Sequence, residues 1–275
     1  MKKKLVRIAL ISIMLVGLSV MLYPAVSDYL NSFRQSRVIA SYKDNAAQLS
    51  GTDCRELLES AREYNKKLVY KNNRFTFTDK DMKELLSAFD FTGTGNIGVV
   101  NIGAIGVSLP IYLGTSEGVL QIGTGLFEGS SLPVGGAGTH SVILGHRGLQ
   151  SSMLFTNLDK LAIGDTFTLQ VLTDTLTYEI DQIEIVTPYD FSLLSIDPDE
   201  DYCTLLTCTP YGVNSHRLLV RGRRVFPGGA LRANSRDDSR VAQAAALLLL
   251  FAAAFILKNA RAIIAKAAGR KYGCA

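Results

Sequence analysis

Residues 204–225 read TLLTCTPYGVNSHRLLVRGRRV, and this stretch decides the fold of the chain. An apolar run ends at Cys208, the segment TPYGVN contains the proline, glycine and asparagine that are typical of turns, and a second run begins near Arg217. Two strands that are joined by a short turn form a hairpin. The pattern therefore predicts that Arg217 lies beside Cys208.

Short runs of the same kind continue backward from this hairpin to residue 96. They are rich in β-branched residues, are broken by glycine, and number about seven: IGVVNI, VSLPIY, HSVILG, TFTLQVL, LTYEIDQIEIV, CTLLTC and HRLLVRGRRV. The chain shows no internal repeat of the length found in solenoids or propellers. We therefore expect a closed or nearly closed β-barrel over residues 96–228.

Residues 28–95 follow a helical pattern instead. Apolar side chains recur three or four positions apart, at Leu57, Leu58, Ala61, Tyr64 and Leu68. No proline occurs between Pro24 and Pro110, and the segment from Asn72 to Thr78 interrupts the pattern. We expect a helical region in front of the barrel.

Charge is distributed unevenly along the chain. The formal net charge of +4 comes from 29 Lys and Arg against 25 Asp and Glu. Nine of the basic residues and none of the acidic ones lie in residues 1–7 and 258–275, so the 250 residues between these tails carry a net charge of −5. A nucleic-acid groove requires the opposite sign, which argues against a nucleic-acid partner.

Each basic tail adjoins an apolar run. Residues 8–27 carry no charge and, at about 1.5 Å per residue, can cross the roughly 30 Å hydrocarbon core of a bilayer. Residues 241–257 span about 26 Å and follow a polar linker, residues 229–240. The alternative for the first run is a cleaved signal peptide, and the alternative for the second run is a buried or amphipathic helix. Because positive charge stays on the cytoplasmic side, we expect two membrane spans, cytoplasmic tails at both ends and an extracellular domain between them.

Few side chains in the domain can perform chemistry. The histidines are His140, His146 and His216, and the barrel region contains Cys203 and Cys208. A separation of five residues places the two cysteines on opposite faces of a strand, and no zinc-ligand spacing surrounds them. We therefore predict no disulfide between them, no metal site and no cofactor.

Cys208 is the candidate nucleophile, because a cation such as Arg217 beside it favours the thiolate or stabilises an oxyanion. The alternative is that Cys208 is a small buried apolar residue and Arg217 a solvated strand residue. A cysteine nucleophile also needs a proton donor. The glycines around His146 favour that histidine, whereas His140 and His216 fit structural positions in strands.

The string at 204–225 resembles the class C sortases, the pilus-assembly cysteine transpeptidases of Gram-positive bacteria. The same resemblance is carried by GTHSVILGHRGL at 138–149, LPIYLGTSEGVL at 109–120 and EGSSLPVGG at 128–136. It covers about residues 30–228. It implies a mostly β fold, a closed sortase-type barrel of about eight strands with N-terminal helices, flanked by two transmembrane helices.

The resemblance also implies roles for individual residues. Cys208 matches the nucleophile that attacks the Thr–Gly carbonyl of an LPxTG-like sorting signal, His146 the acid/base histidine, and Arg217 the oxyanion-stabilising arginine. The implied partners are pilins or other surface proteins with such signals, an acceptor amine and the lipid bilayer. A pilin lysine would resolve the thioester. The alternatives are attachment to cell-wall peptide amines and a non-enzymatic anchored ectodomain.

One feature of that class is missing from the sequence. Class C sortases usually carry an Asp-Pro-aromatic lid motif in front of the barrel, and here that region contains no proline. Either the site is open, or residues 70–95 cover the groove by other means with Phe75, Phe77, Phe89 and Phe91.

Overall fold

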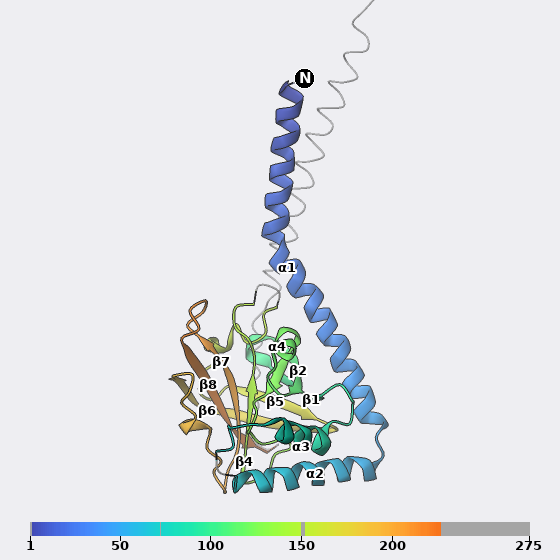
Figure 1. The fold of residues 1–275 in the computed structure, drawn as a ribbon, viewed down its shortest axis with the longest axis vertical. Coiled ribbons are helices and arrows are strands. Elements are labelled where there is room, and N and C mark those ends of the chain that lie inside the picture. The colour runs from blue at the N-terminus through green and yellow to red at the C-terminus, as the bar shows by residue number, and fades with distance from the viewer. Residues whose placement is uncertain (1, 72, 150–151, 227–275) are drawn as a thin grey trace, which may run out of the picture. The chain divides into compact units, whose positions relative to one another are not determined.

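A closed barrel of eight strands forms the body of the protein, shown in a computed structural model that describes residues 2–71, 73–149 and 152–226 (Figure 1). The strands are β1 (Asn96–Ile102), β2 (Val107–Leu113), β3 (Thr124–Leu126), β4 (Thr139–Leu144), β5 (Thr166–Val171), β6 (Asp174–Val186), β7 (Asp201–Thr209) and β8 (His216–Val225). Their order around the barrel is β1-β2-β3-β4-β7-β8-β6-β5. The predicted barrel is confirmed.

Most neighbouring strands are antiparallel, but β2 and β3 are parallel and so are β4 and β7. Short helical segments connect the strands: η1 (Gly103–Ile105), α4 (Glu117–Ile122), η2 (Leu158–Lys160) and η3 (Ser192–Leu194). The parallel pairing of β4 with β7 is important for the site, because it places the residues that follow each strand at the same end of the barrel.

Both faces of β7 are covered, which explains why its sequence is apolar without alternation. Cys203 and Leu205 belong to the main core inside the barrel. Leu206 belongs to a second, smaller cluster on the other face, with Leu219 of β8 and Val142 of β4. Strands buried on both faces read as continuous apolar runs rather than alternating ones.

The N-terminal region is helical, as expected. It contains α1 (Lys2–Gln48), α2 (Gly51–Val69) and α3 (Asp79–Phe89). Ser50 is the N-cap of α2 and Thr78 is the N-cap of α3, each in a reciprocal capping box with the aspartate three residues later. The interruption that the sequence indicates before residue 79 is therefore the connection between α2 and the N-cap of α3.

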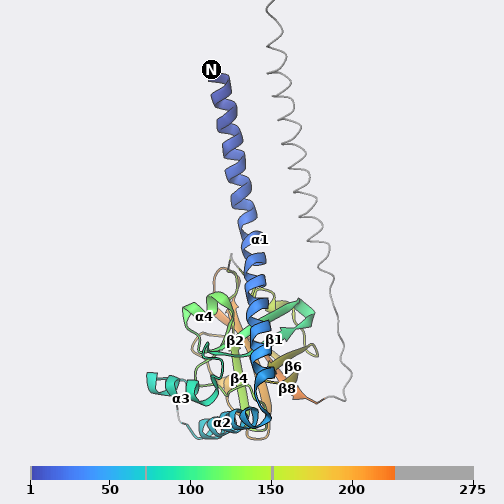
Figure 2. The same cartoon turned by 90° about the vertical axis from the view of Figure 1, so that its right-hand side faces the viewer.

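The second half of α1 is fixed to the barrel, while its first half extends beyond it (Figure 2). The Tyr42 side chain is 1% exposed. Its hydroxyl donates to the Ile97 carbonyl oxygen at 2.8 Å and accepts from the Leu172 amide at 2.8 Å. Asn65 of α2 makes a similar clamp on the backbone of Leu132, at 3.0 and 2.7 Å.

Among the described residues, α1 is the one helix that is long and apolar enough to cross a membrane. The helix does not end with the apolar run at residue 27, and it continues through Pro24 and onto the barrel. The second predicted span, residues 241–257, lies outside the described residues and stays a prediction.

Candidate active site

Cys208 lies near the end of β7 and is partly exposed. Cys203, five residues earlier, faces the barrel interior and is completely buried. Burial raises the pKa of the Cys203 thiol well above its ordinary value, so this cysteine stays protonated. The two cysteines lie on opposite faces of the strand, as the odd spacing predicted.

The predicted hairpin places Arg217 directly opposite Cys208 in the antiparallel register of β7 and β8. Gly212 and Asn214 adopt left-handed backbone conformations in the connecting loop, with φ of 76° and 58°, which their residue types tolerate. Nη1 of Arg217 donates to the backbone oxygens of Asn214 at 3.2 Å and His216 at 3.0 Å. The loop therefore orients the guanidinium at the end of the barrel.

His146 follows β4, which pairs with β7 in parallel register up to Leu144 opposite Leu206. The pairing continues beyond the strand, because Gly145 N donates to Leu206 O at 3.0 Å and Thr207 Oγ1 donates to Gly145 O at 2.7 Å. Extended by two residues past the end of β4, this register aligns His146 with Cys208. The register thus brings together residues that are 62 positions apart.

In this extended register His146 and Arg217 fall on either side of Cys208, in one row across three neighbouring chain segments. Adjacent strands in a sheet lie about 5 Å apart, so the row is compact. A thiol, an imidazole and a guanidinium in such a row supply a nucleophile, a proton carrier and a fixed cation, which is the set that acyl transfer requires.

Two side chains that the sequence did not single out make contacts around His146. Glu117, at the start of α4, places Oε2 3.7 Å from His146 Nε2, a buried atom that makes no hydrogen bond to the described residues. Arg147 donates to Thr209 Oγ1 at 3.0 Å and also pairs with Asp159. No spacing in the sequence links these residues, because each contact joins distant segments.

Gly145 and Gly148 are required by close packing. A Cβ atom on Gly145 would lie 2.7 Å from the Phe155 ring. Gly148 has a φ of +80°, and a Cβ atom there would lie 3.0 Å from the Tyr211 ring. The glycines that favoured His146 in the sequence therefore let this segment approach its neighbours closely.

The other two histidines lie elsewhere. His140 is buried in β4, where Nδ1 donates to Ser195 O at 2.8 Å and Nε2 accepts from Thr204 Oγ1 at 2.7 Å. Burial lowers the pKa of His140 to about 4, so it is neutral at pH 7. His216 is exposed and contacts the neighbouring Ser215 hydroxyl. The structural role expected of His140 agrees with its burial, whereas His216 is not packed.

A second row lies next to the candidate row on the same face. Leu144, Leu206 and Leu219 are paired in register across β4, β7 and β8. Each lies two residues from its counterpart in the candidate row, which corresponds to about 7 Å along a strand. These leucines form an apolar floor that leads to Cys208.

Aromatic side chains cover this floor. Phe75, from the connection between α2 and α3, packs against the cluster together with Phe127 and Phe191. The ring centroids of Phe75 and Phe191 lie 4.8 Å apart in a stacked arrangement, and those of Phe75 and Phe127 lie 5.7 Å apart. Arg74 attaches the same segment to the barrel by donating to the backbone oxygens of Gly129 and Leu194. Of the four phenylalanines that the sequence offered as a cover, Phe75 lies over this floor, whereas Phe89 belongs to the main core and Phe77 and Phe91 pack against that core.

Comparisons with known proteins identify the family. The sortase domain family matches residues 100–225. The fold matches the crystal structure of sortase C1 from Streptococcus agalactiae with a TM-score of 0.67 and 47% identity, over 69% of this chain and 98% of that chain. The chain belongs to the sortase family. This sortase also matches sortase C of Streptococcus pneumoniae, with a TM-score of 0.63 and 44% identity over 71% of this chain and 100% of that one.

A curated relative extends the comparison beyond the streptococci. Sortase D of Bacillus subtilis (strain 168) is 28% identical over 191 residues, which cover 68% of this sortase and 92% of the relative. The resemblance to class C sortases is confirmed, and the protein is a cysteine transpeptidase of this family. The alternative of a non-enzymatic ectodomain is thereby set aside.

Proposed function

We propose that this sortase is a membrane-anchored transpeptidase that uses Cys208 as nucleophile, His146 as acid and base, and Arg217 as oxyanion donor. The observation that carries the proposal is the pairing of Cys208 with Arg217 at the end of the hairpin, together with the β4–β7 register, whose extension past β4 aligns His146 with Cys208. Cys208 is partly exposed there, whereas Cys203 is enclosed in the core.

In the first half-reaction, the Cys208 thiolate adds to the carbonyl carbon between Thr and Gly of an LPxTG-like sorting signal. The carbon–nitrogen bond then breaks and the threonine acyl group remains on sulfur as a thioester. The departing amine takes a proton from His146, because an unprotonated amide nitrogen is a very poor leaving group.

Arg217 is suited to stabilise the oxyanion that forms during this addition. Its two hydrogen bonds to the loop use Nη1, and among the described residues none is made by Nε or Nη2. A guanidinium carries five N–H groups in a rigid fork, so those nitrogens keep donors for the substrate oxygen. A positioned donor of this kind contributes about 3 kcal/mol to transition-state stabilisation.

In the second half-reaction, we propose that a lysine amine of a pilin subunit attacks the thioester. The amine transfers a proton to His146, an isopeptide bond forms, and Cys208 is released. The thioester retains the acyl-transfer energy of the cleaved peptide bond, so no nucleotide is needed. The similar sortase C of S. pneumoniae is described for its pilin substrate specificity, and a further match is sortase C1 of GBS Pilus Island 1, with 38% identity and a TM-score of 0.65.

The proposed location is the outer face of the cell membrane. The apolar first half of α1 supports a span, and the basic residues before it support a cytoplasmic N-terminus. The run at 241–257 would provide the second span and place the basic C-terminal tail, residues 258–275, on the same side.

The acceptor decides between the two remaining functions. The full-length sortase is incubated in vesicles with a sorting-signal peptide and with both a purified pilin and a cell-wall stem peptide, and the product is identified by mass spectrometry. We expect an isopeptide to the pilin lysine, and no product from the Cys208→Ala variant. Incorporation of the stem amine alone would contradict pilin polymerisation and indicate cell-wall attachment.

A further inference from the structure

Large apolar side chains are exposed on the loops at the catalytic end of the barrel. They are Ile122, which ends α4, Met153 in the loop after β4, and Tyr211 and Val213 between β7 and β8, with exposed fractions of 52%, 48%, 60% and 69%. We refer to these four as the apolar loop residues. Their exposure to water costs free energy unless another apolar phase covers them.

The helix α1 places these loops close to the end of the proposed span. Asp28 is the first charged residue after the apolar run, and its Oδ1 accepts a hydrogen bond from Met153 N at 2.7 Å. Seven residues later, Gln35 Nε2 donates to Ile122 O at 3.1 Å. At a rise of about 1.5 Å per residue, the helix positions that contact Met153 and Ile122 are about 10 Å apart along α1.

The contacts that α1 makes near its C-terminal end lie much farther from the proposed span. Tyr42, which is bonded to Ile97 and Leu172, follows Asp28 by 14 residues, or about 21 Å along the helix. In both views, α2 lies at the end of the barrel away from the first half of α1 (Figures 1 and 2). The catalytic end is therefore the end of the barrel that lies nearest to the proposed span.

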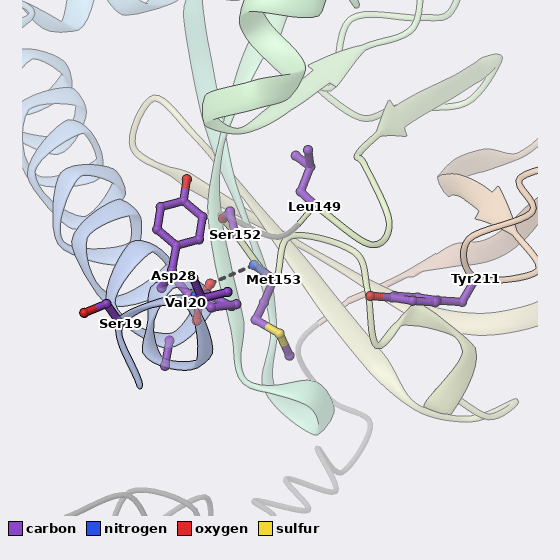
Figure 3. A pocket seen from close by; sticks show the side chains of 10 residues that line it. Ser19, Val20, Asp28, Leu149, Ser152, Met153 and Tyr211 are labelled. Carbon is purple, nitrogen blue, oxygen red and sulfur yellow. Dashed lines mark hydrogen bonds between the residues drawn. The ribbon is translucent and has the colours of Figure 1, made fainter. Parts of the chain in front are cut away.

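A cavity of about 790 Å³ connects the proposed span to these loops. Val20, Tyr23 and Ala25 line it from α1, and Leu149, Met153 and Tyr211 line it from the catalytic end (Figure 3). The α1 side belongs to the last turns of the apolar run, so the cavity lies at the depth where acyl chains meet head groups. Ser19, Asp28 and Ser152 also line the cavity, so polar and apolar groups meet in it.

We propose that the catalytic end of the barrel is seated on the outer leaflet of the bilayer that α1 spans. Met153, Tyr211 and Val213 enter the boundary between head groups and acyl chains, and lipid fills the cavity beside α1. Tyrosine suits this boundary, because its ring is apolar and its hydroxyl can stay hydrated. The proposal rests on the proposed span of α1 and is independent of the roles assigned to Cys208 and His146.

This seating places the Cys208 thiol close to the membrane surface, which favours substrates that are held at the membrane. Tyr211 follows Cys208 by three residues, so the two α-carbons are at most about 11 Å apart. The thiol therefore works within about a nanometre of the leaflet. Both the sorting signal and the acceptor would be best presented by proteins that are themselves held at the membrane, since tethering raises their effective concentration.

The absence of tryptophan from the sequence provides a direct test. Single-tryptophan variants of the full-length chain, Met14→Trp, Tyr211→Trp, Val213→Trp and Tyr70→Trp, are reconstituted in vesicles of phosphatidylcholine and phosphatidylglycerol. Tyr70 is the matched control, because it is 87% exposed and follows α2 at the opposite end. Emission is compared between ordinary lipids and lipids brominated near the top of the acyl chains.

We expect bromine quenching and a blue-shifted emission for tryptophan at positions 14, 211 and 213, and neither effect at position 70. Quenching at 14, with positions 211 and 213 behaving like position 70, would overturn the seating and leave the span and the transpeptidase intact. Absence of quenching at 14 would overturn both the span and the seating. Cleavage of a soluble sorting peptide, measured on the same samples, tests the proposed chemistry separately.

A charge at the leaflet boundary provides a second test. Met153→Glu should reduce turnover of a sorting peptide anchored to the same vesicle more than turnover of the soluble peptide, because burying the carboxylate in the acyl boundary is costly. Tyr70→Glu should not change the ratio of the two rates. Equal ratios for both variants would contradict the seating.

Discussion

Replacing Phe75 by alanine should uncover the apolar floor beside Cys208. Phe75 stacks on Phe191 at 4.8 Å and packs on Phe127 at 5.7 Å. Each aromatic pair contributes about 0.5–1.5 kcal/mol beyond its burial, and the partly buried ring itself adds about 1 kcal/mol of transfer free energy. The covered form should therefore lose about 2–4 kcal/mol relative to the uncovered one.

That loss corresponds to an increase of roughly 30- to 1,000-fold in the ratio of uncovered to covered forms, since about 1.4 kcal/mol is a factor of ten. When opening is fast, the rate at which a protected group reacts follows the population of the open form. Because Cys208 is already partly exposed, its gain in reactivity should be smaller than this ratio, and we expect Cys208 in Phe75→Ala to react with a mild alkylating reagent about tenfold faster, as measured by peptide mapping.

Two controls make the result interpretable. Phe226→Ala removes a phenylalanine that is 75% exposed, beyond the far end of β8, and should leave the Cys208 rate unchanged. Cys203 is 0% exposed and reports global unfolding, so it should stay unreactive in both variants. If Cys208 reacts equally fast in Phe75→Ala, Phe226→Ala and the parent chain, the aromatic cover does not control access and the reasoning is wrong.

Three further predictions test the catalytic row, the anchoring of α1 and the buried histidine. Arg217→Ala should lower single-turnover cleavage of a sorting peptide by about 100-fold or more, and near-normal turnover would remove its role as oxyanion donor. Tyr42→Phe leaves the Ile97 carbonyl and the Leu172 amide without their partner, so denaturation in urea should show a loss of about 2–4 kcal/mol in the free energy of unfolding, and an unchanged midpoint would contradict the clamp. Because burial lowers the pKa of folded His140 to about 4 from 6.5, the unfolded state binds the extra proton between these values, and stability should fall by about 3 kcal/mol as the pH drops from 6.5 to 4. His140→Gln should lose this dependence and the exposed His216→Gln should keep it, so a pH profile of unfolding that is identical in both variants would refute the assignment.

Local features of the protein could be predicted from the order of residues. The hairpin pairs Cys208 with Arg217 across a short loop, and the loop residues carry the required conformations themselves. The capped helices α2 and α3 and the apolar run of α1 are also encoded within a few turns of chain. For such features, the residues that interact are the residues that lie close in sequence.

The contacts that complete the site are not local. Glu117 approaches His146 across 29 residues, and Phe75 reaches Phe191 across 116. The glycines next to His146 indicated this histidine as the candidate. Neither the contact of Glu117 nor the cover by Phe75 could be predicted from spacing, because hydrophobic packing and long-range register have no fixed separation along the chain.

The sequence by itself therefore determined a β-rich domain behind an apolar N-terminal run, with a cysteine and an arginine paired at the end of one hairpin, because periodicity, turn chemistry and charge act over short distances. Only the tertiary structure decided that parallel pairing of β4 with β7 brings His146 to that hairpin. It also decided that α1 continues unbroken from the apolar run onto the barrel, and that Asp28 bonds to the loop that follows β4. These arrangements depend on how separate elements pack around one closed barrel, and the free energy of that packing is shared by residues that no local pattern connects.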